Sequence, residues 1–177
     1  CLSKPLIHNN ILYIITGSNY ITAPFTQNKQ FSLLAYNLKT REKHCLITFY
    51  SPPITQGLLI HNNTLYIGIT SPQHGFKNTT KEGIGSRVHL RALTLDKTGL
   101  NVIKQETLYK GQITAYAMAP NNKLLIAIQK SGKHGSLLLS TKTKKQYGHV
   151  PYYITELKRS QNQIFAVANK HHQASNI

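Results

Sequence analysis

Carboxylates are scarce in this chain of 177 residues. The acidic residues stand one to a segment, at Glu42, Glu82, Asp96, Glu106 and Glu156. Glycosidases place two carboxyl groups on either side of the bond they cleave, and calcium sites gather several oxygen ligands around one ion. Such sites would have to recruit their members from distant segments. We therefore expect neither carboxylate-based hydrolysis nor a calcium site.

Other catalytic or metal-binding patterns are also missing from the sequence. The nine histidines are dispersed, and the two cysteines form no pair of the kind that structural zinc sites use. A Ser-His-Asp triad would need Asp96, the sole aspartate, which the sequence places in a turn. The GIGS segment at 83–86 lacks the lysine and helix of a phosphate-binding loop. We predict no catalytic residue, no metal and no cofactor, and a protein that is not an enzyme.

The charge of the chain is strongly positive. Lys and Arg number 21 against 5 acidic residues, which gives a formal net charge of +16. Only 4 of the cations are Arg, the side chain that best makes bidentate contacts to guanine and phosphate, so sequence-specific nucleic-acid recognition is disfavoured. Diffuse attraction to an anionic membrane, glycan or protein surface remains open.

The first residue points to processing. The sequence begins at Cys1 without a methionine, followed by Leu2 and Ser3, and it resembles the mature end of a bacterial lipoprotein, in which this Cys carries the lipid. The resemblance implies export, lipidation of Cys1 and an outer-membrane location facing the periplasm or the exterior. Cys45 lies in the apolar run Cys-Leu-Ile-Thr-Phe, and we expect it to be buried. A disulfide between Cys1 and Cys45 is an open alternative in an oxidising compartment.

An internal repeat organises the chain. IHNNILYIITG from Ile7 and IHNNTLYIGIT from Ile60 share seven residues in register. MAPNNKLLIAI from Met118 and RSQNQIFAVAN from Arg159 keep the pattern, and the second Asn of each copy falls at 10, 63, 122 and 162. Asn tolerates positive φ, so an Asn pair between apolar runs predicts a tight hairpin turn of the primed type.

A second polar turn, which contains Lys-Thr, recurs after each of the first three copies. It lies in FSLLAYNLKTREKHCLITF, VHLRALTLDKTGLNVIKQETL and GSLLLSTKTKKQYGHV. Each repeat therefore predicts four strands in two hairpins. The second strand is almost continuously apolar, as a strand covered on both faces should be, whereas the third and fourth have the pattern of an outer, half-exposed pair. Polar inserts follow the second strand in the first two repeats and predict exposed loops.

Four-stranded units of about 40–45 residues are typical of β-propeller blades. We predict an all-β, β-propeller-like fold of about three and a half four-stranded blades in a single domain, 1–177. The units cover approximately 5–53, 54–112, 113–151 and 152–177, and the last has no second hairpin. Its outer strands come from elsewhere, or residues after Ile177 supply them, or the sheets form an open arc. We favour a partial chain of a larger or incompletely closed propeller.

Two of the Lys-Thr turns carry a family resemblance. YNLKTRE and TLDKTGL, each downstream of a Leu-Tyr-Ile strand, resemble the turn between strands three and four of quinoprotein-type and WD40-like propeller repeats. Only the second has the full Asp96-Lys97-Thr98-Gly99, and the Trp typical of such repeats is absent. With a lipid on Cys1, the resemblance extends to propeller lipoproteins that help assemble outer-membrane proteins, which implies a role in a cell-envelope assembly.

Two surfaces are candidate binding sites. Strands of a blade alternate in direction, so both kinds of turn should lie along one edge and form a basic rim. The candidate rim residues for anions or partners are Lys39, Arg41, Lys43, Lys97, Lys142, Lys144 and Lys145. The opposite edge carries the inserts, and loops on a rigid scaffold are where binding residues concentrate. The candidate partner-binding residues there are Tyr20, Phe25, His74, Phe76 and Lys77.

These features favour a non-enzymatic, exported β-propeller scaffold for protein–protein interaction, lipid-anchored in a bacterial cell-envelope assembly. The alternative is a binding module for an anionic glycan, lipid or polynucleotide that uses the Lys-rich rim. A third hypothesis is a quinoprotein-like or hydrolytic propeller enzyme in which Asp96 or Glu156 acts with acidic residues of an unseen remainder.

Overall fold

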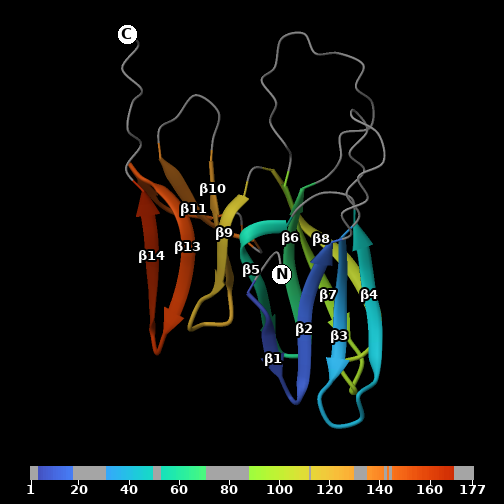
Figure 1. Ribbon diagram of the computed structural model, residues 1–177. Coiled ribbons are helices and arrows are strands. Elements are labelled where there is room, and N and C mark those ends of the chain that lie inside the picture. Colours follow the sequence, from blue (N-terminus) through green and yellow to red (C-terminus); the bar gives the residue numbers. More distant parts are fainter. Residues whose placement is uncertain are drawn as a thin grey trace, which may run out of the picture. The chain divides into compact units, whose positions relative to one another are not determined.

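A computed structural model describes residues 4–17, 31–49, 53–70, 88–111, 113–129, 135–141, 143 and 145–169. Fourteen strands in these ranges form four antiparallel sheets (Figure 1). In the part described, no helix is long and apolar enough to cross a membrane. The chain divides into two compact units, Cys1–Gly111 and Gln112–Ile177. The all-β prediction is confirmed, and a single domain over the whole chain stays a prediction.

The first unit contains two four-stranded sheets, each with its strands in sequence order (Figure 1). The first sheet consists of β1 (Leu6–His8), β2 (Ile11–Gly17), β3 (Phe31–Asn37) and β4 (Lys43–Phe49). The second consists of β5 (Pro53–His61), β6 (Thr64–Thr70), β7 (Val88–Leu95) and β8 (Val102–Gly111). Both are meanders, in agreement with the two hairpins predicted for each repeat.

The second unit contains one more meander of four strands and one hairpin. The meander consists of β9 (Ile113–Met118), β10 (Leu124–Ile128), β11 (Ser136–Ser140) and β12 (Gln146–Val150). The hairpin consists of β13 (Tyr153–Ser160) and β14 (Gln163–Asn169). Within the described residues the fourth repeat therefore has only its first two strands, as the sequence predicted.

The Asn pairs of the first two repeats form the predicted primed turns. Asn9 and Asn10 have φ of 49° and 61°, and Asn62 and Asn63 have φ of 46° and 54°. Positive φ at both central residues is the signature of a type I′ turn, whose twist matches that of the flanking strands. The turn is specified locally, because few other residues adopt this conformation at low cost.

The turns of the third and fourth repeats have other backbone conformations. In the third repeat Pro120 has a fixed negative φ, and of the Asn pair that follows only Asn122 is left-handed, at 58°. Its amide donates to the Ala119 carbonyl, which gives a longer loop between β9 and β10. In the fourth repeat Gln161 has φ 49°, and positive φ at the first position alone fits a type II′ turn.

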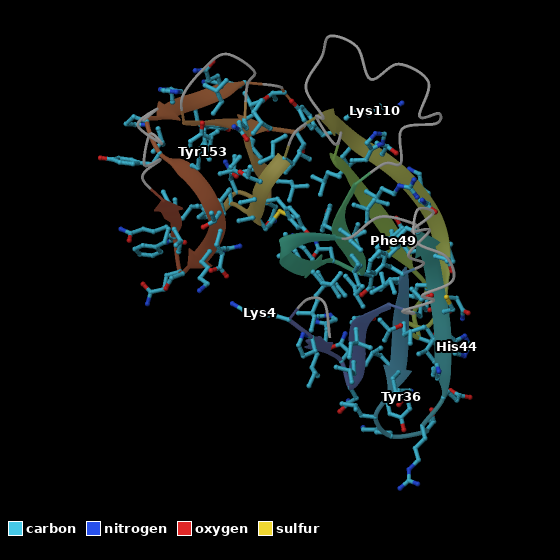
Figure 2. The ribbon with its side chains drawn as sticks, turned by 45° about the horizontal axis from the view of Figure 1, so that its top comes forward. Lys4, Tyr36, His44, Phe49, Lys110 and Tyr153 are labelled. Atoms are coloured by element: carbon cyan, nitrogen blue, oxygen red, sulfur yellow. The ribbon has the colours of Figure 1, made fainter. Side chains whose placement is uncertain are left out.

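The core of the first unit lies between its two sheets. The first sheet contributes alternate residues of β2 and β3, among them Tyr13, Ile15 and Leu33, and the second sheet contributes Leu65 and Ile67. Figure 2 shows Phe49 at the end of β4, and its ring stacks on that of Phe31 with the centroids 5.8 Å apart. Burying side chains of this size contributes about 1.5–3 kcal/mol each, so this interface is the main stabilising contact of the unit.

The core of the second unit uses small residues on one sheet and larger ones on the hairpin. Ala115 and Ala117 on β9 pack with Ile154 and Leu157 on β13, and all four are buried. The Ile154 amide donates to the Ser136 hydroxyl at 2.9 Å. This bond fixes the start of β13 beside β11.

Two burial predictions were wrong. The third strand is not half-exposed, since Leu33, Leu90 and Leu93 are fully buried, whereas the fourth strands β4, β8 and β12 have many exposed residues. Cys45 is exposed rather than buried. A bulge beside Leu34 shifts the register of β4, so that Cys45 pairs with Leu34 on the face turned away from the core.

Candidate functional site

The turn edge of the first unit is built by backbone bonds between the two kinds of turn. The Leu38 amide donates to the Asn10 carbonyl at 2.9 Å, and the Leu95 amide donates to the Asn63 carbonyl at 2.8 Å. Each Lys-Thr turn therefore lies beside the Asn turn of its own sheet, as expected. In the first sheet, the Asn37 side chain accepts from two amides of the following loop and closes an Asx turn.

Asp96 plays the same structural part in the second sheet. Its Oδ1 accepts from the Thr98 hydroxyl at 2.7 Å, and its Oδ2 accepts from Asn101 Nδ2 at 2.8 Å. These bonds favour the ionised form and lower the pKa of Asp96 to about 2. The aspartate predicted to have a turn role is thus held as a turn acceptor.

Replacing Asp96 by Asn should flatten the acid dependence of stability. The folded-state pKa lies below the ordinary value of 3.8, so the carboxylate's contribution is complete above that value and is lost as the pH falls towards about 2. Asn fills the equivalent position at Asn37, so the turn should persist. We expect the wild-type unfolding midpoint to fall more steeply than that of D96N between pH 4 and pH 2. Parallel pH profiles would contradict the assigned bonds.

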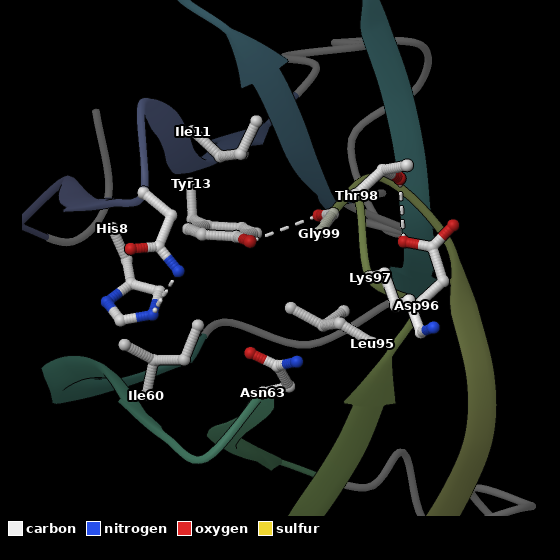
Figure 3. A pocket seen from close by; sticks show the side chains of 11 residues that line it. His8, Ile11, Tyr13, Ile60, Asn63, Leu95, Asp96, Lys97, Thr98 and Gly99 are labelled. Atoms are coloured by element: carbon white, nitrogen blue, oxygen red, sulfur yellow. Dashed lines mark hydrogen bonds between the residues drawn. The ribbon is translucent and has the colours of Figure 1, made fainter.

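Tyr13 connects the two sheets at this edge. Its hydroxyl donates to the Gly99 carbonyl at 3.0 Å, and this bond is drawn in Figure 3. Burial, followed by the negative charge of Asp96, raises the pKa of Tyr13 to about 12, so the hydroxyl keeps its proton at neutral pH. Gly99 has φ 75°, and a Cβ there would stand 2.7 Å from the Tyr13 hydroxyl oxygen. The left-handed φ, together with this close approach, therefore favours glycine at this position of the Asp-Lys-Thr-Gly turn.

A second contact between the sheets lies farther along the edge. Nδ1 of His44, labelled in Figure 2, is 3.2 Å from Oδ1 of Asn101.

A shallow pocket beside Tyr13 has a volume of about 20 Å³ (Figure 3). It is lined mainly by His8, Ile60, Asn63, Leu95 and Lys97. A volume of this size holds about one water molecule and no organic substrate.

Several of the predicted rim residues lie in or beside the turns, and their binding role stays a prediction. Lys39 and Arg41 are exposed in the turn between β3 and β4, Lys43 is exposed at the start of β4, and Lys97 is exposed in the turn between β7 and β8. Lys145 is exposed just before β12 in the second unit. Glu42 lies between β3 and β4 and Asp96 lies between β7 and β8, so each of these turns also carries a carboxylate that reduces its positive potential.

The remaining predicted site residues lie outside the part of the chain that the structure describes. They are Cys1, Tyr20, Phe25, His74, Phe76, Lys77, Lys142 and Lys144. Within the described ranges, no three His, Cys, Asp or Glu side chains come together as metal ligands would.

The described acidic residues are held in local contacts. Glu42 accepts from the Thr40 hydroxyl, Glu106 pairs with Lys104 at 2.7 Å, and Glu156 pairs with Lys158 at 3.3 Å. Two of these carboxylates face a cation of their own strand, and Asp96 holds its turn. This arrangement stabilises loops and strand surfaces.

An exposed apolar face on β14 is a feature that the sequence reasoning missed. Phe165 and Val167 have exposed fractions of 52% and 47%. Counted from the second Asn of each repeat, they correspond to Tyr13 and Ile15, which have exposed fractions of 1% and 0%. In the second and third sheets the same positions hold the half-buried Tyr66 and Leu125 and the buried Gly68 and Ala127. The repeat alignment therefore carried this signal, because it gives Phe165 and Val167 counterparts that are covered in the other copies.

Comparisons with known proteins support the fold alone. No family model and no curated protein matches the chain. A solved structure described as "Oligogalacturonate lyase in complex with manganese", a seven-bladed propeller, matches with a TM-score of 0.54 and 14% identity. The match covers 86% of this chain and 42% of the lyase chain, so the chain spans less than half of that protein.

This likeness confirms the propeller-like fold class. At 14% identity it carries neither the lyase's activity nor its manganese to this chain. The closer resemblance to quinoprotein-type repeats, and the lipoprotein resemblance, stay predictions.

Proposed function

We propose that this chain is a non-enzymatic, propeller-type scaffold for protein–protein contact. The observation that carries the proposal is the exposure of Phe165 and Val167 at positions whose counterparts in the first sheet are buried. Large apolar side chains that gather on one exposed face favour a partner, because covering them releases ordered water. Aromatic residues are also enriched where protein interfaces bind most strongly.

The state of the acidic residues supports a binding role over a catalytic one. General acid–base catalysis needs a carboxyl group that can reach substrate with a suitable pKa. Asp96 is bound on both oxygens and has a pKa of about 2, and Glu156 is paired with Lys158. The two residues named for an enzymatic alternative are therefore engaged in holding the fold.

Export and lipid anchoring through Cys1 form the second part of the proposal. Their support is the amino-terminal Cys-Leu-Ser sequence. Labelled palmitate should enter the wild-type protein and be lost from a Cys1→Ala variant. Equal labelling of both proteins would remove this part and leave the scaffold role untouched.

A photocrosslinking amino acid at position 165 tests the scaffold role. We expect the full chain, expressed in its native host, to give a discrete crosslinked adduct with a second polypeptide. The same probe at Tyr147, which is exposed on β12 of the same unit, serves as the matched control and should give none. Identical adduct patterns at both positions, or none at position 165, would contradict the proposal.

The alternative function, anion binding through the basic rim, is supported by the exposed Lys39, Arg41 and Lys97 at one edge of the first unit. Lys97→Glu should weaken binding to vesicles rich in phosphatidylglycerol and reduce its salt dependence, because it reverses a charge within the rim. Lys110→Glu makes the same charge change at the far end of β8 and is the control (Figure 2). Equal losses for the two variants would show non-specific attraction and rule out the rim as the binding site.

A further inference from the structure

Within the described residues, one edge of β14 has a defined set of backbone groups that pair with no strand. Ser160 pairs with Gln163 around the two-residue turn, and Phe165 pairs with Lys158. Antiparallel pairs alternate between bonded and non-bonded positions, so the amides and carbonyls of Ile164 and Ala166 point away from β13. In the described part of the chain, no other strand pairs with this edge.

The other repeats show what fits such an edge. β2, β6 and β10 each pair along this edge with an antiparallel third strand, namely β3, β7 and β11. Ile14 pairs with Leu34 in the first sheet, and Ile14 corresponds to Ala166 when residues are counted from the Asn turn. The third strands are extended and rich in Leu and hydroxyl residues, as in Phe-Ser-Leu-Leu-Ala-Tyr-Asn of β3. The edge is therefore matched to an apolar, antiparallel strand.

Charge favours a partner protein over a second copy of this chain. Each copy carries a formal charge of +16, so two copies repel each other. Arg159 is exposed on β13 at the turn end of the hairpin, beside Lys158, which pairs with Glu156 of its own strand. A third strand antiparallel to β14 ends beside this turn, as β3 ends beside the Asn9–Asn10 turn. Acidic residues after the strand would meet Arg159.

We propose that this edge of β14 binds an extended segment of a partner protein as an added antiparallel strand, apolar along its length and acidic at its carboxyl-terminal end. This assignment rests on the proposed scaffold function and names the chemistry of its partner. Backbone bonds to Ile164 and Ala166 provide affinity, as in other cases of strand addition, and Arg159 selects the acidic end.

The test uses the full chain and a fluorescent peptide with the β3 sequence Phe31–Asn37 followed by three glutamates. We expect saturable binding by fluorescence anisotropy, weakened by salt and weakened further when lysines replace the glutamates. N-methylation of the peptide at the Leu34 position removes a hydrogen bond to the β14 edge and should weaken binding about tenfold. The amide at the Leu33 position points away from β14, so its N-methylation should change binding little. Ala166→Pro in the protein, which removes the facing amide, should act like the Leu34 methyl group.

Three outcomes would overturn the proposal. They are equal losses for the two methylated peptides, no binding of any peptide, and a concentration-dependent dimer of the chain that Ala166→Pro abolishes. The methylated peptides leave the protein unaltered, so they decide the question even if Ala166→Pro does not fold. If the crosslink at position 165 forms while the peptides fail, the scaffold function stands and strand addition alone is wrong. If both fail, both proposals fall.

Discussion

Replacing Gly135 by Ala should lower the free energy of unfolding of the second unit by about 2–6 kcal/mol. Gly135 has φ 95°, a conformation that side chains with a Cβ rarely adopt. An added Cβ would collide with the Val150 carbonyl oxygen and stand 2.9 Å from the Pro151 Cα. Both contacts are with backbone, which cannot turn aside as a flexible side chain can. The strand ends of β11 and β12 would have to separate.

Gly148 is a matched control for this substitution. It lies on β12 of the same sheet, and a Cβ there meets nothing within 4 Å. Ala is less flexible than Gly in the unfolded chain, so Gly148→Ala should leave stability unchanged or raise it by less than about 1 kcal/mol. Urea unfolding followed by tyrosine fluorescence compares the two variants. Similar unfolding midpoints for both would show that the close approach at Gly135 is absent in solution.

Local signals in the sequence predicted the strands and turns well. The type I′ turns at Asn9–Asn10 and Asn62–Asn63 were predictable because the conformation is a property of the two residues themselves. The requirement at Gly135 was not, because it arises from the Val150 carbonyl on another strand. A glycine in a polar segment gives the same local signal whether or not a distant backbone approaches it.

The burial predictions failed where the register between two strands shifts, because this too depends on contacts between segments distant in the sequence. Cys45 sits in an apolar run, but a bulge between β3 and β4 turns it to the exposed face. Bulges depend on how two strands fit together, and a single strand's pattern does not reveal them. The burial of the third strand was missed likewise, because in β3 one face is fully buried and the other is half-buried, which the alternating pattern of one strand does not reveal.

The same distinction between local signals and contacts between strands applies to the candidate site. The basic turn residues Lys39, Arg41 and Lys97 were predictable, because turns are exposed wherever hairpins form. The Tyr13–Gly99 bond joins residues 86 positions apart, so only the packing of the two sheets creates it. The exposed face of β14 needed both the repeat and the structure. The repeat aligns Phe165 with residues that are buried or half-buried in the other copies, and the structure shows Phe165 exposed.

Tyr13→Ala and Phe165→Ala should differ sharply in their effect on stability, although the two residues occupy the same position of the repeat. Tyr13 is buried in the core of the first unit and donates to Gly99, so its truncation should cost about 3–5 kcal/mol. Phe165 has half of its side chain in solvent, so its truncation should cost less than about 1 kcal/mol. Chemical denaturation of each variant measures both values.

A small effect at Phe165 would separate the role of this residue from that of its counterpart. A large aromatic side chain that contributes little to stability is free to serve a partner, and its truncation should then weaken binding while the fold persists. A loss of stability as large as that of Tyr13→Ala would mean that Phe165 is covered within the free protein. The open face of β14, and with it the main support for a scaffold role, would then be lost.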